Sequence, residues 1–482
     1  MEPLLAFPLD IPARGRLQAL HGQLRAAILD GRLRAGQSLP STRALAESLG
    51  LSRNTVVSAY DRLLSEGYLA ARQGAGYRVA AVVPSREASP RAAEGGDHRL
   101  HPHWRDATVP RPMCEQPPMR HDLRACVPDA SQFPYEVWRR LSARALRALS
   151  REPALYDSAV GRRALREAIA GHVSFARAVS CSAEDIVVTN GAQHAFDLLA
   201  RILIVPGQTM LAMEDPGYGP LRRTFELAGA RVAPVPVDDE GLVVERLPPS
   251  TRVIYVTPSH QSPLGVAMSP SRRLALLEFA RRHGAVVIED DYDSEFRYGE
   301  RPLDALQTLD RDGVVFYVGT FSKSLFPALR LGYVVTPPWA LGALARARQL
   351  NDWHGDVLAQ DTLALFIAEG HLARHVRRMR RVYADRRDAL LQALARHAGD
   401  ALAPIPVEAG LHVAARLRWP VPARTVVDEA AREGLRVESL DDSAVGGVAP
   451  HGLLFGLGVQ PAERMDEAVR VLGRVLEAHR PR

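Results

Sequence analysis

The basic residues of this sequence include a single lysine, Lys323, among 61 Lys and Arg residues. Arginine keeps its proton at any usable pH, whereas lysine can lose a proton and act as an amine nucleophile. The count alone is equally consistent with one chance survivor in an arginine-rich composition. The residues around Lys323 therefore decide which chemistry the sequence predicts.

Lys323 lies in the segment VVFYVGTFSKSLFPALRLGY, in a Ser/Thr-rich turn that follows a predicted strand. Thr320 and Ser322 can donate hydrogen bonds to a phosphate, and Arg330 can add a bidentate guanidinium contact. A lysine beside a phosphate site is what pyridoxal phosphate (PLP) requires of a protein. The segment predicts that Lys323 is the catalytic, Schiff-base lysine of a PLP site.

Other segments supply the remaining groups that PLP requires. Asp290 ends the apolar run AVVIEDDYD, and a carboxylate at the C-terminal end of a parallel strand faces the ligand crevice, where it can pair with the pyridinium nitrogen. Tyr292 can reach the phenolic oxygen of the cofactor, and Tyr218 can cover the ring face. The helix that follows the strand DIVVTN offers an anion site at its N-terminus. That N-terminus consists of Gly191, Ala192 and Gln193.

Each of these features also has an interpretation without a ligand. The acidic run at 289–293 is typical of a solvated loop, residues 191–193 are consistent with an ordinary helix start, and Tyr218 is equally consistent with a core position. Their shared order and their placement at strand ends favour the PLP site.

Residues 10–80 are predicted to form a winged helix-turn-helix domain. Leu20, Leu24 and Ile28 repeat at helical spacing, Ser41 and Ser52 are expected to cap the next two helices, and a hairpin follows. The second helix of this motif lies in the major groove of DNA, and here it begins with side chains suited to bases and phosphates. The predicted DNA contacts are Arg43, Ser52, Arg53, Asn54, Thr55 and Gly76.

The distribution of charge supports a polyanion as the partner of this domain. Residues 1–80 hold 10 Arg against 6 Asp and Glu, which is most of the net charge of +6 of the whole chain. A second basic stretch, 371–387, has two interpretations: another DNA-contacting surface, or a solvated helix face with core positions at Val376, Met379 and Tyr383. The second interpretation is favoured because most such stretches are solvated.

The rest of the chain is predicted to be an α/β protein. Residues 81–120 are rich in Pro, Arg and Gly without any period and are expected to form a linker. Residues 121–482 alternate short apolar runs with helical patterns, which indicates a large, mostly parallel sheet. We expect a smaller subdomain near the C-terminus, because one core rarely serves so many residues.

Composition excludes several other classes of protein. Hydrophobic residues make up 46% and charged residues 24%, with no apolar run of about 18 residues and no leader pattern in MEPLLAFPLDIPARGR. The cysteines Cys114, Cys126 and Cys181 lack metal-ligand spacing. We therefore expect free thiols, no metal, no membrane contact and a reducing, cytoplasmic environment.

The segment LPSTRALAESLGLSRNTVVSAYDRLLSEGYL closely resembles the winged-helix domain of GntR-type bacterial regulators. Residues 121–482 resemble the fold-type-I aminotransferases. The combination resembles the MocR subfamily of GntR-type regulators, of which TPSHQSPLG, IEDDYDSEFRYGERPLDALQTLD and YVGTFSKSLFPALRLGY are typical. The resemblance covers nearly the whole chain.

The resemblance implies a transcription factor whose aminotransferase-like domain binds PLP for sensing rather than for catalysis. It also implies a double-stranded DNA operator and a head-to-tail homodimer, in which the DNA-binding domain of one subunit rests on the large domain of the other. One alternative is an active aminotransferase with an accessory DNA-binding module, and a residual transaminase half-reaction stays open. Another alternative is a domain that no longer binds PLP, but the retained lysine site argues against this alternative.

The sequence departs from the family pattern at three positions. Ser262 stands where aminotransferases carry the Asn that bonds the phenolic oxygen of PLP. Pro220 and Val459 stand where amino-acid-sensing members can carry arginines for the carboxylate of the effector. These departures favour PLP itself as the signal, as in the vitamin B6-synthesis (PdxR-like) regulators of the group. A small amine or amino acid, held by Arg222, Arg297 or His260, remains the other candidate effector.

Overall fold

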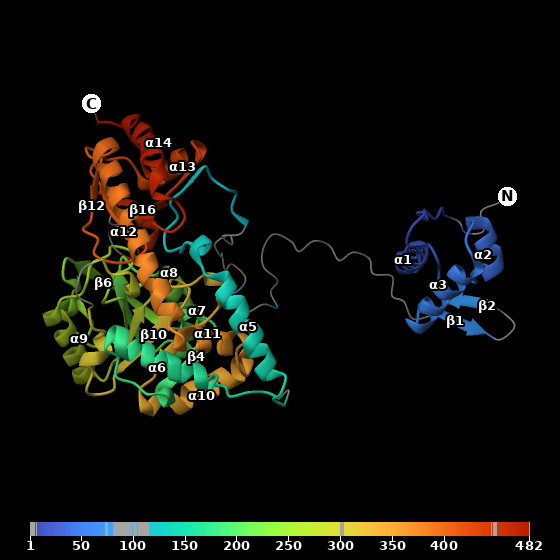
Figure 1. The fold of residues 1–482 in the computed structure, drawn as a ribbon, viewed down its shortest axis with the longest axis horizontal. Helices are drawn as coiled ribbons and strands as arrows, with labels where there is room; N and C mark the ends of the chain where they lie inside the picture. Colours follow the sequence, from blue (N-terminus) through green and yellow to red (C-terminus); the bar gives the residue numbers. More distant parts are fainter. Residues whose placement is uncertain are drawn as a thin grey trace. The chain divides into compact units, whose positions relative to one another are not determined.

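The computed structural model describes residues 5, 7–72, 76–80, 99, 104, 115–153, 155–298, 303–444, 446 and 451–481. The chain divides into two compact units, Met1–Pro110 and Arg111–Arg482 (Figure 1). Most of the predicted linker, and Cys114 with it, lies outside the described residues.

The N-terminal unit contains three helices and a hairpin, as a winged helix-turn-helix requires. The elements are α1 (Arg16–Leu29), α2 (Thr42–Leu49), α3 (Arg53–Ser65), β1 (Leu69–Arg72) and β2 (Gly76–Val79), and the two strands pair in antiparallel fashion. Leu20, Leu24 and Tyr60 lie in the core, and the Tyr60 hydroxyl donates to the carbonyl of Pro40 at 3.0 Å. Tyr60 is therefore a core residue.

Two serine caps fix the turn between α2 and α3. The side chain of Ser41 accepts a hydrogen bond from the amide of Ala44, and Ser52 accepts one from the amide of Thr55, each at 3.1 Å. Gly50 ends α2 at a φ of 62°, which glycine adopts without strain. The sequence signals for both helix starts are thus confirmed.

The large unit is built on an eight-stranded sheet with the order β4-β11-β10-β9-β8-β5-β6-β7. The strands from β10 to β6 run parallel, whereas β11 is antiparallel to both of its neighbours. The bounds are β4 (Ile186–Thr189), β5 (Met210–Asp215), β6 (Arg231–Asp238), β7 (Gly241–Leu242), β8 (Val253–Val256), β9 (Val286–Asp291), β10 (Val315–Thr320) and β11 (Gly332–Val335).

Helices cover both faces of this sheet, because successive strand residues point to opposite sides and nearly all are apolar. One face packs on α7 (Ala192–Leu203), α8 (Gly219–Leu227) and α10 (Pro338–Asp352). The other face packs on α6 (Arg163–Arg177), α9 (Pro270–His283) and α11 (Val357–Ala368), with α5 (Tyr135–Leu149) outside α11. The prediction of a mostly parallel α/β sheet is confirmed.

A smaller subdomain carries the C-terminal third of the unit. Its antiparallel sheet has the order β12 (Leu402–Pro404), β13 (His412–Leu417), β16 (Gly452–Gly456) and β15 (Glu438–Ser439), and it packs with α13 (Ala423–Arg432) and α14 (Met465–Glu477). A second pair joins β14 (Leu435–Arg436) to β3 (His121–Asp122). The start of the large unit therefore belongs to this subdomain, which the sequence pattern did not predict.

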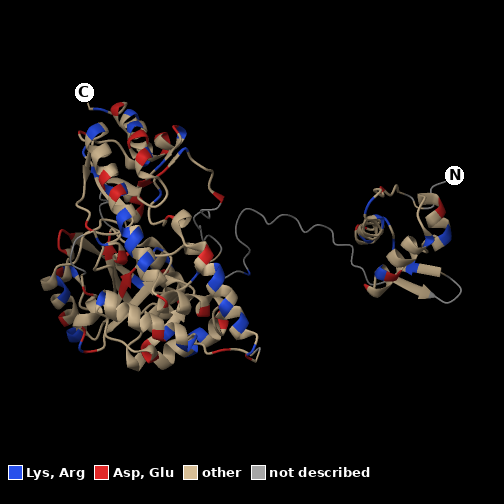
Figure 2. Cartoon of the chain, viewed as in Figure 1, with Lys and Arg blue, Asp and Glu red and all other residues tan. Residues whose placement is uncertain are grey.

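The long helix α12 (His371–His397) contacts both α11 and α14, and so links the large sheet region to the small subdomain (Figure 1). Val376, Met379 and Tyr383 are buried, as expected, while basic side chains are spaced along the helix (Figure 2). None of the helices in the described part of the chain combines the length and apolarity that a membrane span requires.

Candidate functional site

Asp290 lies at the C-terminal end of β9, where the parallel strands open onto a shared edge. The Tyr255 hydroxyl donates to Asp290 Oδ2 at 2.7 Å, but Oδ1 is buried and has no hydrogen-bond partner among the described residues. Burial raises the pKa of Asp290 to about 7. A buried carboxylate with one unpaired oxygen lacks a donor, and the protonated nitrogen of a pyridine ring supplies one.

Lys323 follows β10, the strand next to β9. Its Nζ donates to the backbone carbonyl of Cys126 at 2.6 Å, and its positive charge acts to lower the pKa of Asp290. Cys126 has a φ of 59° in the segment that follows β3. The lysine and the carboxylate therefore face the same space, as predicted, and the carbonyl partner of the lysine comes from the small subdomain.

Gly191 and Arg330 meet at the N-terminus of α7. Arg330 Nη2 donates to the carbonyl of Asn190 at 2.6 Å, and a Cβ on Gly191 would lie 2.9 Å from the Arg330 guanidinium nitrogens. Gly191 has a φ of 82°, so both its conformation and this contact require glycine. A guanidinium beside free helix amides forms an anion site, which fits the phosphate of PLP.

The side chains of the remaining predicted phosphate ligands already form hydrogen bonds within the protein. The Thr320 hydroxyl donates to Ser322 Oγ at 3.0 Å, at the end of β10. The Gln193 side chain donates to Thr224 Oγ1 at 2.6 Å, and the backbone N–H of Gln193 lies in the first turn of α7, as that of Ala192 does.

Tyr218 begins α8 and is 36% exposed, with its ring edge-on to Phe196. The pKa of its hydroxyl is raised by burial and by the charge of Asp290, and the charge of Arg330 opposes this rise. The structure thus brings Tyr218 near both ends of the predicted cofactor, and its role at the ring face stays a prediction.

Ser262, in the loop that follows β8, acts to lower the pKa of the Tyr292 hydroxyl, against the larger rise that burial causes. The Tyr292 oxygen also lies 3.0 Å from His260 Nδ1, and His260 Nδ1 lies 2.9 Å from Asp293 Oδ1. His260 is therefore buried between Asp293 and Tyr292, an arrangement that no local motif indicates.

The acidic run at 289–293 is buried, so its interpretation as a solvated loop is wrong. Asp291 bonds Arg177 Nε at 2.7 Å and the Tyr317 hydroxyl at 2.5 Å, and the Arg177 charge and these hydrogen bonds hold the pKa of Asp291 below its usual value. Glu289 accepts the amides of Leu306 and Gln307. Glu289 and Asp291 therefore have structural roles, whereas Asp290 and Tyr292 are candidate site residues.

The predicted DNA-contacting side chains fall into two groups. Arg43, Arg53 and Asn54 are exposed at the starts of α2 and α3, and within the described residues their side chains show no hydrogen bond. Ser52 and Thr55 share a hydrogen bond of 2.8 Å, so the Ser52 oxygen is occupied as a cap. Gly76 has a φ of 77° and open space around it, so its conformation rather than crowding favours glycine.

The two units thus define a class of protein: a winged-helix DNA-binding domain joined to a domain of the aminotransferase fold. The family model described as bacterial regulatory proteins, gntR family, matches residues 17–79. The model described as aminotransferase class I and II matches residues 126–432.

Relatives combine the same two parts. The chain is 37% identical to the "Probable rhizopine catabolism regulatory protein MocR" of Rhizobium meliloti, over 96% of this chain and 93% of that protein. It is 34% identical to the pyridoxine biosynthesis transcriptional regulator PdxR of Corynebacterium glutamicum, over 94% and 92%. The chain belongs to the MocR subfamily of GntR-type transcriptional regulators.

Among solved structures, a Pyrococcus horikoshii kynurenine aminotransferase in complex with PMP (pyridoxamine phosphate) is similar to this chain with a TM-score of 0.70 and 26% identity, over 75% of this chain and 91% of that chain. An archaeal alanine:glyoxylate aminotransferase gives the same TM-score at 27% identity, over 76% and 92%. The fold is that of PLP-dependent aminotransferases, and the residues described above fit PLP.

When bound, PLP supplies an electrophilic carbonyl and an electron-withdrawing ring. The chain's own residues do the rest. Lys323 would offer the amine, Asp290 a carboxylate for the ring nitrogen, and Arg330 with the α7 amides the anion site. Tyr292 and Ser262 would offer hydroxyls to the phenolic oxygen.

We predict that borohydride reduction of the PLP-loaded protein fixes one phosphopyridoxyl group per chain, on Lys323, and that Lys323→Ala takes up none. Lys323 is the only lysine, so mass spectrometry reads the result without ambiguity. Lys323→Arg is the matched control, because it keeps a cation that can bond the Cys126 carbonyl but cannot act as a nucleophile. Equal labelling of Lys323→Ala would contradict the assignment.

We predict that Arg53→Ala weakens DNA binding at least about tenfold at physiological salt, because a major-groove arginine contact is lost. The probe is the duplex that the wild-type protein selects from a random-sequence library, and the measurement is fluorescence anisotropy. Arg62→Ala, at the other end of α3, should change affinity less. Unchanged affinity for Arg53→Ala would exclude α3 as the recognition helix.

Proposed function

We propose that this regulator senses PLP: that occupancy of the site around Lys323 changes the affinity of the protein for its operator. The observation that carries the proposal is the unpaired, buried Asp290 Oδ1 beside the single lysine. A ligand shifts a conformational equilibrium only by its difference in affinity for the two states. Lys323, on the large sheet, donates to the Cys126 carbonyl of the small subdomain, so a ligand that engages Lys323 would act on both subdomains.

The candidate cations for an amino-acid effector support PLP itself as the signal. Arg297 bonds Glu408 at 2.7 Å, and His260 is held by Asp293 and Tyr292. Arg222 lies 4.0 Å from Glu226 on the same helix. A carboxylate would have to displace one of these partners, at a cost in binding free energy. The relative PdxR, which is named as a pyridoxine biosynthesis transcriptional regulator, also supports PLP as the signal.

We propose that the aminotransferase-like domain is not used for turnover. Ser262 offers a hydroxyl where an amide would be expected, and no cation is placed ready for a substrate carboxylate at Pro220 or Val459. The alternative, an active aminotransferase with an accessory DNA-binding module, is supported by the enzyme neighbours of the fold. The two functions differ in whether bound PLP is converted by an amino acid.

An absorbance titration separates these functions. We saturate the purified protein with PLP and add amino compounds one at a time. We expect the band of the bound cofactor to stay in place with every compound, because PLP itself is the signal. A lasting band shift with one compound would identify an amine effector instead. Decay to pyridoxamine phosphate and recovery with a keto acid would establish an enzyme and contradict the proposal.

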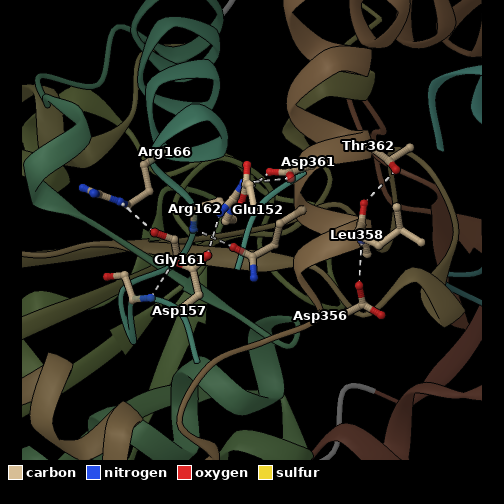
Figure 3. A network of polar contacts seen from close by, with 12 residues as sticks. Glu152, Asp157, Gly161, Arg162, Arg166, Asp356, Leu358, Asp361 and Thr362 are labelled. Carbon is tan, nitrogen blue, oxygen red and sulfur yellow. Dashed lines mark hydrogen bonds and ion pairs between the residues drawn. The ribbon is translucent and has the colours of Figure 1, made fainter. Parts of the chain in front are cut away.

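We also propose a homodimer, with the DNA-binding domain of each subunit resting on the large domain of the other. An exposed apolar face supports it: the rings of Tyr156 and Trp353 stack at 4.7 Å while 76% and 55% exposed, and Leu350 is 89% exposed. Arg162 braces this face by binding Asp157 at 2.7 Å and Asp361 at 2.9 Å (Figure 3). A face this apolar and this well braced suits a second copy of the chain.

We predict that the double variant Tyr156→Ser, Leu350→Glu sediments as a monomer at concentrations where the wild-type protein is a dimer. If the double variant formed the same dimer, the carboxylate introduced at position 350 would be buried in the interface without a partner. Leu274→Glu, on α9 and 58% exposed, is the matched control and should stay dimeric. A dimeric double variant would place the interface elsewhere.

A further inference from the structure

His260 and Asp293 form a buried pair beside Tyr292. Their side chains are 2% and 1% exposed, and His260 Nδ1 lies 2.9 Å from Asp293 Oδ1 and 3.0 Å from the Tyr292 oxygen. One ring nitrogen therefore faces two oxygens. It carries at most one proton, so the position of that proton decides what the Tyr292 hydroxyl can do.

The carboxylate of Asp293 decides the position of the proton on His260. Asp293 Oδ2 already accepts the amide of Leu411 at 3.2 Å, and an ionised carboxylate has no proton to give. Nδ1 must therefore carry the proton and donate it to Oδ1. The opposite arrangement would place two lone pairs against each other in a buried site, which is costly.

The surroundings of Nε2, the other ring nitrogen of His260, are consistent with this tautomer. His260 Nε2 is buried, has no hydrogen-bond partner among the described residues, and faces Gly265, where a Cβ would lie 3.2 Å away. A second proton on Nε2 would be a buried donor without an acceptor. The hydrogen-bond geometry of His260 therefore places its proton on Nδ1.

The consequence falls on Tyr292. Because Nδ1 carries a proton, Tyr292 cannot donate to it and can only accept. The Tyr292 hydroxyl proton must then point away from His260, which leaves it available for donation to the phenolic oxygen of PLP. Without the pair, the same hydroxyl would be free to rotate.

The pair is also closed off by the small subdomain. A Cβ on Gly410 would lie 2.1 Å from His260 Cε1 and 2.6 Å from Asp293 Oδ2, and Gly410 has a φ of 88°. Gly410 and Leu411 lead directly into β13. The backbone that enters β13 therefore rests on the same two side chains that orient Tyr292.

His260, Asp293 and His412 also offer donor atoms within 4.8 Å of one another, as a metal site would. Both nitrogens of His412 are engaged, however: Nε2 with the Pro263 carbonyl at 3.0 Å and Nδ1 with Cys126 Sγ at 3.7 Å. Burial lowers the pKa of His412 and raises that of Cys126 to about 12, so both are neutral. This arrangement forms a chain of hydrogen bonds.

We propose that His260 and Asp293 are a positioning pair, which fixes the Tyr292 hydroxyl as a hydrogen-bond donor to the phenolic oxygen of the cofactor. The inference needs PLP in the site and does not depend on which compound is the effector. The other titratable groups facing Tyr292 are Asp290 and Cys126, with Lys323 and His412 next to them. These groups are unchanged in the variants that follow.

The test is a pH titration of the absorbance of the bound cofactor. We expect His260→Leu and Asp293→Asn to raise the midpoint by about one pH unit or more, because the ionised phenolic oxygen loses a hydrogen-bond donor. His260→Asn should stay close to the wild-type midpoint, since its amide can donate to Asp293 from the place of Nδ1. His375→Gln, at another buried histidine, should leave the midpoint unchanged.

A double-variant comparison tests whether the pair acts through Tyr292. Tyr292→Phe should raise the midpoint, and adding His260→Leu to it should cause no further rise. Additive shifts, or an unchanged midpoint in folded His260→Leu, would overturn the proposal. Where His260→Leu does not fold, Asp293→Asn gives the same comparison. If PLP does not change the affinity of the protein for DNA, the proposed function is refuted. The midpoints still test the positioning pair in that case.

Discussion

The site depends on one buried carboxylate that lacks a partner. Asp290 lies at the end of β9 and is buried, and among the described residues its only hydrogen bond is the one from the Tyr255 hydroxyl to Oδ2. Such a carboxylate is costly to bury unless a donor arrives. The protonated nitrogen of a pyridine ring would supply that donor, and Lys323 and the anion site at Arg330 suit the carbonyl and the phosphate of PLP.

The two subdomains share this site through backbone groups. Lys323 reaches the carbonyl of Cys126, and Asp293 accepts the amide of Leu411. Both of these backbone segments belong to the small subdomain, while the side chains that bond them belong to the large sheet. A cofactor that engages Lys323 would compete with the bond to Cys126, and its binding would act on the small subdomain through that bond.

Local patterns in the sequence predicted much of this arrangement. Serine caps, helical spacing and a glycine helix start depend on neighbours within a few residues, so Ser41, Ser52 and Gly191 were found correctly. The carboxylate of Asp290 was found because strand ends converge in a parallel sheet. The pair of His260 and Asp293 could not be found, because it joins residues 33 apart and is closed by Gly410. The pairing of β3 with β14 was not predicted either, because these two strands also lie far apart in the sequence. The acidic run was misjudged because its partners, such as Arg177, lie more than a hundred residues away.

The proposed function depends on a link between PLP binding and DNA binding, and one measurement tests this link most directly. The affinity of the full-length protein for its selected duplex is measured with and without PLP, for the wild-type protein and for Lys323→Arg. We expect PLP to change the wild-type Kd by about tenfold or more, equivalent to about 1.4 kcal/mol of coupling, and to leave the Kd of Lys323→Arg unchanged. An identical wild-type Kd with and without PLP would contradict it.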